Sequence, residues 1–217
     1  MIRKLLLILI VLLASATAWA NDVVGIPDVH IGNIWKYREI DDFTKETTLE
    51  YSHRVVRLDD KEIVVQLQNK GTSARKLKYF TREWNDTDSG DVKWEPFNPQ
   101  YKFPMSVGLF WDREFRWFTR QGASFSSFAK ARVVALEKVT VPAGTFDAYK
   151  IVSNIETRKN GADAEVRTGR IITWYAPIVK KCVRVESTTF SDGRQRESHI
   201  DELVEYSLTK EPAAPGN

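Results

Sequence analysis

The chain has a single cysteine, Cys182, in its 217 residues, so no intrachain disulfide can form. A chain of this length can bury enough apolar surface to fold without covalent cross-links. Histidine is also scarce, and His30, His53 and His199 stand far apart. None of them has the His-x-x-x-His spacing of a metal site, and no nucleophile elbow, phosphate loop or dinucleotide fingerprint occurs. The sequence therefore predicts no metal ligand, no cofactor and no catalytic residue, and it disfavours an enzyme.

A strong excess of charge of either sign is missing as well. Lysine and arginine together number 32, against 29 aspartate and glutamate residues. Arg3 and Lys4 precede an apolar run typical of a leader peptide, and its removal leaves 30 basic and 29 acidic residues, a net charge of +1. A nearly neutral chain is not drawn electrostatically to a polyanion. We therefore expect no nucleic acid partner.

Long hydrophobic runs are confined to the N-terminus, where one extends over Leu5–Leu13. The basic start, this run and the small-x-small sequence Ala18-Trp19-Ala20 predict a cleavable signal peptide over residues 1–20. Nine apolar residues are too few to span a bilayer, so a membrane anchor is disfavoured. Asn21 rather than a cysteine follows the predicted cleavage site, which argues against a lipid anchor. We expect a periplasmic protein with no transmembrane segment in the mature chain.

The first half of the chain also lacks amphipathic helical patterns, and alternation with a two-residue period takes their place, as in Ile63, Val65 and Leu67. The second half has five further strand-like runs separated by turns: Ala131–Val141, Asp147–Thr157, Arg167–Tyr175, Val179–Phe190 and Arg196–Leu208. We predict one β domain over residues 21–208, followed by a disordered tail over residues 209–217.

Two parts of this domain echo each other. Gly32-x-x-Trp35 recurs as Gly108-x-x-Trp111, and the Val-Val-x-Leu run that ends at Leu58 recurs as the run that ends at Leu136. The offsets are 76 and 78 residues, so one small insertion aligns both pairs. Chance is the alternative, because valine and leucine are common in strands. A duplicated meander, with halves at about 31–84 and 103–208, predicts an all-β antiparallel fold that forms a strongly curved sheet or a half-open barrel.

The clearest turn signal is the hairpin Val139–Phe146, in which Pro142 suits a type I turn and Gly144 suits a positive φ. With Trp174-Tyr175-Ala176-Pro177 and the stretch Phe103–Trp111, this hairpin resembles a family of uncharacterised secreted bacterial β-proteins. The resemblance covers Phe103 to Leu208, and the chain departs from it at Ile178 and Lys180, where the family usually has glycine. It implies a fold but no activity. Some relatives are similar to half-barrel lipoprotein carriers of the periplasm.

Nine of the 25 aromatic residues fall within Trp94–Phe118, and these predict the ligand-binding surface. Aromatic rings can line a slot for an acyl chain, and arginines can contact an anionic group. A role in the core between the two halves is favoured for the block as a whole, and individual rings can serve both purposes. The predicted ligand-binding residues are Trp111, Phe115, Trp117, Trp174, Tyr175, Arg113 and Arg116.

The resulting prediction is a non-enzymatic periplasmic protein that binds a hydrophobic or amphipathic, lipid-like ligand in the concave face of its sheet. Two alternatives stay open: an envelope scaffold or interaction module with a filled core, whose protein partner pairs with a sheet edge, and a hydrolase whose site is not visible in the sequence. Strand alternation places Cys182 on one face with Lys180, Arg184 and Glu186, where an unreactive strand residue is favoured over a nucleophile.

Overall fold

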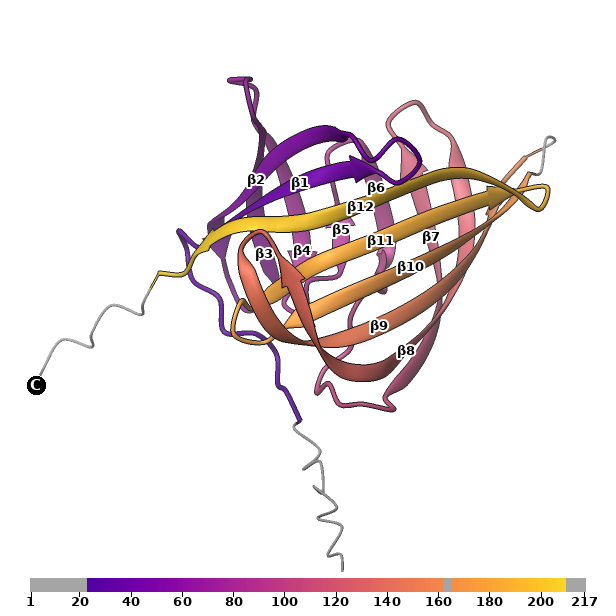
Figure 1. The fold of residues 1–217 in the computed structure, drawn as a ribbon. Coiled ribbons are helices and arrows are strands. Elements are labelled where there is room, and N and C mark those ends of the chain that lie inside the picture. The colour runs from indigo at the N-terminus through magenta and orange to yellow at the C-terminus, as the bar shows by residue number, and fades with distance from the viewer. Residues whose placement is uncertain (1–22, 162–164, 210–217) are drawn as a thin grey trace, which may run out of the picture.

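The computed structural model describes residues 23–161 and 165–209 (Figure 1). The predicted signal peptide, residues 1–20, lies outside the described residues, as does the predicted tail beyond Thr209. Among the described residues, no helix is long and apolar enough to cross a membrane.

Twelve strands close into one antiparallel barrel in which each strand pairs with its neighbours in sequence and β1 pairs with β12. The predicted all-β antiparallel class is confirmed, and the sheet closes fully where the sequence suggested a half-open barrel. The strands are β1 (Ile34–Asp41), β2 (Thr47–Leu58), β3 (Glu62–Asn69), β4 (Lys76–Thr81), β5 (Asp86–Asp88), β6 (Val92–Asn98), β7 (Phe110–Thr119), β8 (Ser124–Val141), β9 (Gly144–Lys159), β10 (Val166–Ala176), β11 (Lys181–Ser191) and β12 (Arg194–Ser207).

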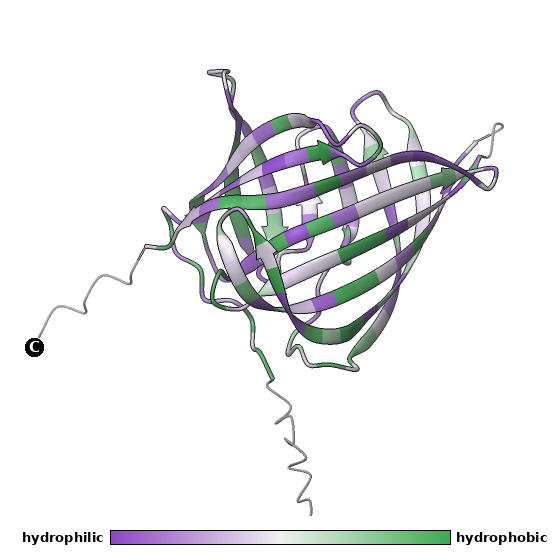
Figure 2. Cartoon of the chain, in the orientation of Figure 1, coloured by the Kyte–Doolittle hydropathy of each residue, from purple (hydrophilic) through white to green (hydrophobic). Residues whose placement is uncertain are grey.

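The strands form where the side chains alternate between the barrel interior and solvent. From Phe128 to Val133, β8 has exposed and buried residues in strict turn. Small Ala129 and Ala131 occupy inward positions that are 1% exposed, where large side chains of neighbouring strands fill the space. Figure 2 shows the same alternation as hydrophobic and hydrophilic bands along the long strands. A period of two residues is what a sheet with one buried face requires.

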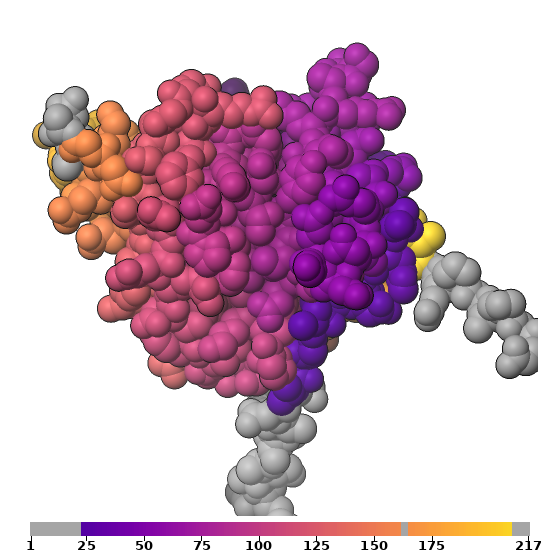
Figure 3. All heavy atoms as spheres, turned by 180° about the vertical axis from the view of Figure 1, so that it is seen from behind, coloured from indigo at the N-terminus to yellow at the C-terminus, as the bar shows by residue number. Residues whose placement is uncertain are grey.

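Two irregular segments lie against one end of the barrel. Val24 and Met105 exchange backbone hydrogen bonds of 2.9 and 2.7 Å, and Met105 is fully buried. The rings of Tyr101 and Phe103 pack edge-on against Tyr175 inside the barrel, with ring centroids 5.8 and 5.4 Å away. These contacts fill that end with a continuous hydrophobic core. Seen from behind, the N-terminal segment runs along the face built by the first half of the chain (Figure 3).

The β8–β9 hairpin folds over the neighbouring strands (Figure 1). Its turn has Gly144 at φ +134°, a conformation that residues with a Cβ rarely adopt. The Ala143 N–H donates to the Leu203 carbonyl of β12 at 3.1 Å, and the Phe146 ring packs edge-on against Tyr206 at 5.9 Å. The hairpin therefore joins the middle of the chain to its last strand.

Candidate functional site

The inward-facing side chains change from buried to half-buried along the barrel. On β10, Tyr175 and Thr173 are 1% and 8% exposed, whereas Ile171, on the same face, is half-buried. On β11, Val183 is fully buried, and Val185 and Ser187, paired with Thr173 and Ile171, are half-buried. Water therefore reaches the inner side of one end of the barrel, while the other end is packed.

We call the half-buried inward-facing side chains of this second end the inner wall. Their register partners on neighbouring strands belong to the same face, because directly opposed residues of antiparallel strands point the same way. The inner wall comprises Tyr51, Leu67, Lys78, Trp117, Phe125, Ile155, Ile171, Val185, Ser187, His199 and Asp201. It combines aliphatic and aromatic side chains with a few polar ones, which is the composition of a small-molecule site.

The aromatic part of the inner wall is a stacked pair. The rings of Trp117 and Phe125 lie 3.7 Å apart and within 8° of parallel, and the Trp117 Nε1–H donates to Ser127 Oγ at 3.1 Å. The Ser127 hydroxyl also hydrogen-bonds Thr157 at 2.8 Å. These contacts hold the indole in one orientation across β7, β8 and β9.

Below the inner wall, polar groups gather around the ring of Phe80. Lys181 Nζ and Lys78 Nζ lie 5.0 and 5.3 Å from its centroid, and the His53 ring lies 6.4 Å away. Asp86 is the register partner of Phe80, and its Oδ1 lies 3.5 Å from Lys78 Nζ. We call Lys78, Lys181, His53 and Asp86 the polar floor.

Lys181 is a buried cation surrounded by aromatic faces. It is 6% exposed, and its Nζ lies 3.7 Å from the ring centroid of Trp84 and 5.4 Å from that of Trp35. Among residues 23–161 and 165–209, no carboxylate lies within ion-pair distance of this Nζ. Burial lowers the pKa of Lys181 to about 8, and the nearby positive charge of Lys78 acts in the same direction.

Two further groups of the polar floor each have one atom without a hydrogen-bond partner in the described part of the chain. His53 is 7% exposed and its Nδ1 is unpaired. Burial first, and then the charges of Lys181 and Lys78, hold the pKa of His53 well below its usual range, so the imidazole is neutral. Asp86 Oδ2 accepts a hydrogen bond from Gln100 at 2.5 Å, but Oδ1 has only the long ion pair with Lys78.

Tyrosine hydroxyls surround the barrel interior next to Cys182. Tyr37 donates to the Cys182 carbonyl at 2.7 Å, and its hydroxyl is 3.7 Å from Sγ. Tyr51 stacks on Tyr37 and donates to Asp201 Oδ1 at 2.8 Å. Burial raises the pKa of both tyrosines well above the usual value, and it also raises the pKa of Asp201. Both phenols therefore stay protonated as donors.

The placement of Cys182 corrects the expectation from strand alternation. The register of β10 and β11 shifts between Trp174 and Tyr175, so that Cys182 pairs with Tyr175 and faces the interior. Arg184 and Glu186 instead form an ion pair of 2.8 Å on the outer side. A bulge inserts one residue into a strand and reverses the faces beyond it, and regular alternation cannot register it.

The predicted ligand-binding residues divide between the interior and the outer surface. Trp111, Phe115 and Tyr175 are 7%, 6% and 1% exposed and belong to the buried interior, and the Trp111 Nε1–H donates to the Pro99 carbonyl at 3.1 Å. Trp117 lies in the inner wall. Arg113 shares this inward face of β7, because it is the register partner of Ala129, so the structure brings five of the seven to the inward face.

The two arginines and Trp174 have other surroundings. Arg113 is exposed and rests on the ring of Phe97, 4.4 Å from its centroid. Arg116 lies 3.6 Å from Glu95 and lines an outer groove of about 730 Å³ together with Glu114, Phe128 and Arg158. Trp174 faces outward, where its Nε1–H donates to Glu137 Oε1 at 2.7 Å and Lys150 lies over its ring.

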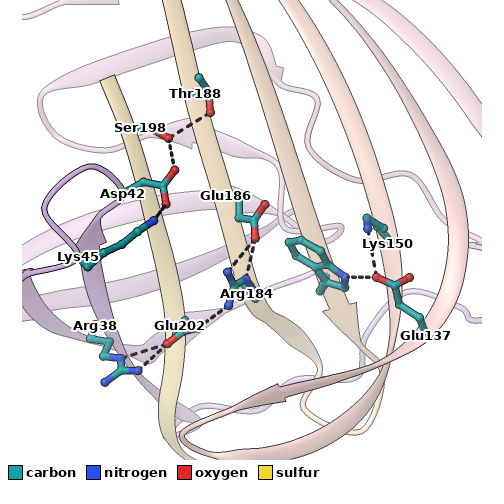
Figure 4. A network of polar contacts seen from close by, with 11 residues as sticks. Arg38, Asp42, Lys45, Glu137, Lys150, Arg184, Glu186, Thr188, Ser198 and Glu202 are labelled. Carbon is teal, nitrogen blue, oxygen red and sulfur yellow. Dashed lines mark hydrogen bonds and ion pairs between the residues drawn. The ribbon is translucent and has the colours of Figure 1, made fainter. Parts of the chain in front are cut away.

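The contacts of Trp174 are one of several groups of polar contacts on the outside of the barrel. Figure 4 shows Glu137 and Lys150 in one group, apart from the groups around Glu202 and around Asp42. Glu202, with a side chain 10% exposed, accepts hydrogen bonds from Arg38 at 2.7 Å and from Arg184 at 2.6 Å. These contacts fix strands to one another and do not face the inner wall.

The residues of the polar floor were not identified from the sequence as a site. The two-residue alternation of the strand places Lys181 on the same face as Val179 and Val183. A lysine on an otherwise apolar face is the one feature of the sequence that points to this site. His53, Lys78 and Asp86 come from three other strands, so no sequence spacing connects them. Within the described ranges, no group of three or more His, Cys, Asp or Glu side chains is arranged to hold a metal ion.

Comparison with known proteins adds a family model and solved structures. A family described as DUF3108-like matches residues 123–193, which include the hairpin Val139–Phe146 and the turn Trp174–Pro177. No curated protein matches the sequence.

Three solved structures resemble the fold. A candidate lipoprotein from Parabacteroides distasonis is 18% identical, with a TM-score of 0.57 over 86% of this chain and 100% of the other. A candidate exported protein with a YmcC-like fold from Bacteroides fragilis is 18% identical, with a TM-score of 0.51 over 85% and 99% of the two chains. The hypothetical lipoprotein YmcC from Escherichia coli is 7% identical, with a TM-score of 0.44 over 84% and 86%, which is too low to argue from. The first two share the fold of this chain over most of its length.

Proposed function

We propose that this protein is a non-enzymatic protein of the bacterial periplasm that binds a hydrophobic or amphipathic, lipid-like ligand inside its barrel. The observation that carries the proposal is the change in burial along the inward faces of the strands. A barrel that serves only as a scaffold gains stability by filling its interior at both ends. Here one end is packed, and the inward-facing side chains of the other end are half-buried.

The chemistry of the inner wall supports an amphipathic ligand. Ile155, Ile171 and Val185 offer aliphatic surface, and the Trp117–Phe125 pair offers an aromatic plane. Asp201, His199 and Lys78 supply polar contacts in the same wall. Apolar surface that water reaches gains free energy of about 25 cal/mol per Å² when a ligand covers it.

A periplasmic location is supported by the predicted signal peptide and by the two structures of the same fold, which are described as a candidate lipoprotein and a candidate exported protein. A binding role rather than a catalytic one is supported by the contacts of Cys182. Within the described residues, its thiol has tyrosine hydroxyls and no imidazole within hydrogen-bond distance. A cysteine nucleophile needs a neighbouring base.

The proposal is tested with the full-length precursor, expressed for export and collected from the periplasm without denaturant. Native mass spectrometry and solvent extraction should reveal a co-purified small amphiphile. After delipidation, the naphthalene dye 1-anilinonaphthalene-8-sulfonate should bind with a change in tryptophan emission. Long-chain fatty acids or lysophospholipid should displace the dye.

A matched pair of variants on β10 locates the binding. Ile171 faces the inner wall and Ile172 the outside, so Ile171→Ser should weaken dye and lipid binding while Ile172→Ser should not. Protein that carries no amphiphile, and binds the dye equally well in both variants, would contradict the proposal.

The interaction-module alternative has one structural observation in its favour. β6 pairs with β7 only over Val92–Glu95, so the part of β7 that begins at Phe110 has no strand partner on that side among the described residues. The outer groove containing Arg116 lies beside it. Unpaired strand edges accept added strands from partner proteins. Cross-linking at Arg116 that captures one defined envelope protein, with no amphiphile found in the barrel, would favour this alternative.

A further inference from the structure

The polar floor lies at the inner end of the inner wall and contains both buried side-chain atoms, His53 Nδ1 and Asp86 Oδ1, that lack a hydrogen-bond partner among the described residues. We propose that it binds the carboxylate group of an acyl-chain ligand, with Lys181 as the anchoring cation and the chain extending along the inner wall. The inference rests on the proposed function and specifies the chemical class of its ligand.

The first support is the set of unpaired groups. Lys181 Nζ lies against aromatic faces, and the buried His53 Nδ1 has no hydrogen-bond partner among the described residues. Asp86 Oδ1 has the ion pair with Lys78, and as an acceptor it does not itself bind a carboxylate. Buried polar groups in native proteins are nearly always paired, and those left unpaired mark a bound ligand, water or ion. Lys181 and His53 both lie next to the ring of Phe80.

The charge of the polar floor selects an anion with one negative charge. Lys78 and Lys181 contribute two positive charges when protonated, Asp86 contributes one negative charge, and His53 is neutral. One positive charge is therefore left without a partner. A carboxylate neutralises it, and its two oxygens accept hydrogen bonds from an ammonium and an imidazole N–H.

The aromatic faces argue against a ligand that carries a cation. Trp84, Phe80 and Trp35 form the kind of box that recognises quaternary ammonium groups, but the ammonium of Lys181 already occupies it. A choline-type head group would have to displace a covalently attached lysine. The box instead holds the Lys181 charge in place for a ligand that approaches from the inner wall.

Two residues at the polar floor or next to it are half-buried. The Lys78 side chain is 23% exposed and belongs to the inner wall as well as to the floor. Cys182 also faces the interior and is half-buried, although Tyr37 beside it is 3% exposed. Solvent therefore reaches both residues, and the proposal places the acyl chain over Leu67, Ile171 and Val185 of the inner wall.

The test uses the delipidated full chain and three probes of equal chain length: laurate, dodecyl phosphate and dodecanol. Calorimetry should give the order laurate, then dodecyl phosphate, then dodecanol. Lys181→Met should weaken laurate binding about tenfold or more, because it removes a charge-assisted hydrogen bond, and should leave dodecanol unchanged. Lys180→Met is the matched control. Lys180 is the preceding residue and its Nζ contacts Asp28 at the barrel surface, so laurate affinity should stay the same.

A second variant guards against loss of folding. Asp86→Asn removes the negative charge of the polar floor and should strengthen laurate binding several-fold, a direction that general destabilisation cannot produce.

Tighter binding of dodecyl phosphate than of laurate would overturn the carboxylate assignment. Equal binding of laurate and dodecanol, unaffected by either variant, would mean that only water fills the polar floor. In both cases the proposed function stands if Ile171→Ser still weakens dye binding. If no probe and no dye binds, the proposed function fails as well.

Discussion

The ammonium of Lys181 lies 3.7 Å from the centre of the Trp84 ring, and the Trp84 Nε1–H donates at 2.9 Å to the carbonyl of Lys180, the residue before it. The Trp84 indole therefore makes two contacts with the start of β11. Its N–H binds the backbone at Lys180, and its ring face lies against the Lys181 ammonium. A cation over a desolvated indole gains electrostatic stabilisation, but it loses its hydration. Burial lowers the pKa of Lys181 to about 8, because the charged form loses its hydration.

The lowered pKa of Lys181 predicts how the stability of the fold depends on pH. Lys181 has a pKa of about 8 in the folded protein against 10.5 ordinarily, so the unfolded chain binds more protons between these values. The free energy of unfolding should therefore rise as pH increases from about 8 toward 10.5, by about 3 kcal/mol from this group. Lys181→Met should remove that rise.

The measurement is urea unfolding of the wild type and Lys181→Met at a series of pH values from 7 to 10. The difference between the two proteins isolates Lys181, because the buried tyrosines, whose raised pKa values lower stability at still higher pH, are common to both. Parallel curves over this range would contradict the assignment.

A second prediction concerns the contact between Trp174 and Glu137, which ties the hairpin to β10. Trp174→Phe should lower the free energy of unfolding by about 2 kcal/mol at pH 7, through the lost hydrogen bond and the smaller ring. In a double-mutant cycle with Glu137→Ala, the coupling energy should be about 1 kcal/mol.

The same variant should change the titration of Glu137. Its pKa is lowered first by the Trp174 indole and then by Lys150, so this stabilisation is present above its ordinary pKa and is lost as pH falls through the lowered value. Trp174→Phe should return the pKa toward its usual range, which NMR titration can follow. Additive free energies together with an unchanged pKa would show that the hydrogen bond does not form in solution.

Gly144 gives a third prediction. At φ +134° an alanine is strained, so Gly144→Ala should cost about 1–3 kcal/mol. Gly25 has open space around it and an ordinary φ, and Gly25→Ala should be neutral or slightly stabilising. Thermal unfolding of both variants is the measurement. Equal melting temperatures would mean that the hairpin turn relaxes to accept a Cβ.

The ion pairs of Glu202 on the outside of the barrel give a fourth prediction. Glu202 is shared by Arg38 and Arg184, so Glu202→Gln should cost about 2 kcal/mol by leaving two guanidinium groups without a charged partner at this position. Glu205 pairs with Lys36 in an exposed position, with side chains 61% and 51% exposed, and Glu205→Gln should change stability by less than about 0.5 kcal/mol. A loss of the same size in both variants would show that burial of Glu202 contributes nothing.

The all-β class and the hairpin could be predicted because both depend on local signals. Alternation marks a strand wherever one face is buried, and Pro142 with Gly144 marks the turn. Closure of the barrel depends on the pairing of β1 with β12, and nothing within Ile34–Asp41 specifies so distant a partner. The curvature was therefore predictable, whereas complete closure was not.

The site was predictable in part for a related reason. An inward-facing aromatic residue serves a core and a ligand slot equally well, so Trp111 and Trp117 look alike in the sequence although one is buried and the other half-buried. Their contact with a ligand stays a prediction. Cys182 reaches the interior beside a bulge, and regular alternation cannot predict a shift of one residue in register.

The pairing of Ile34 with Ser207 also constrains the order of folding. Every other strand pairs with a neighbour in sequence, so hairpins can form one after another as the chain emerges. The last contact joins the two ends of this series and has the largest loop to close. Until β12 is present, the growing sheet has two open edges that can pair with another chain. A chain that stops before Arg194 keeps both edges permanently, so its characteristic failure is association with other chains.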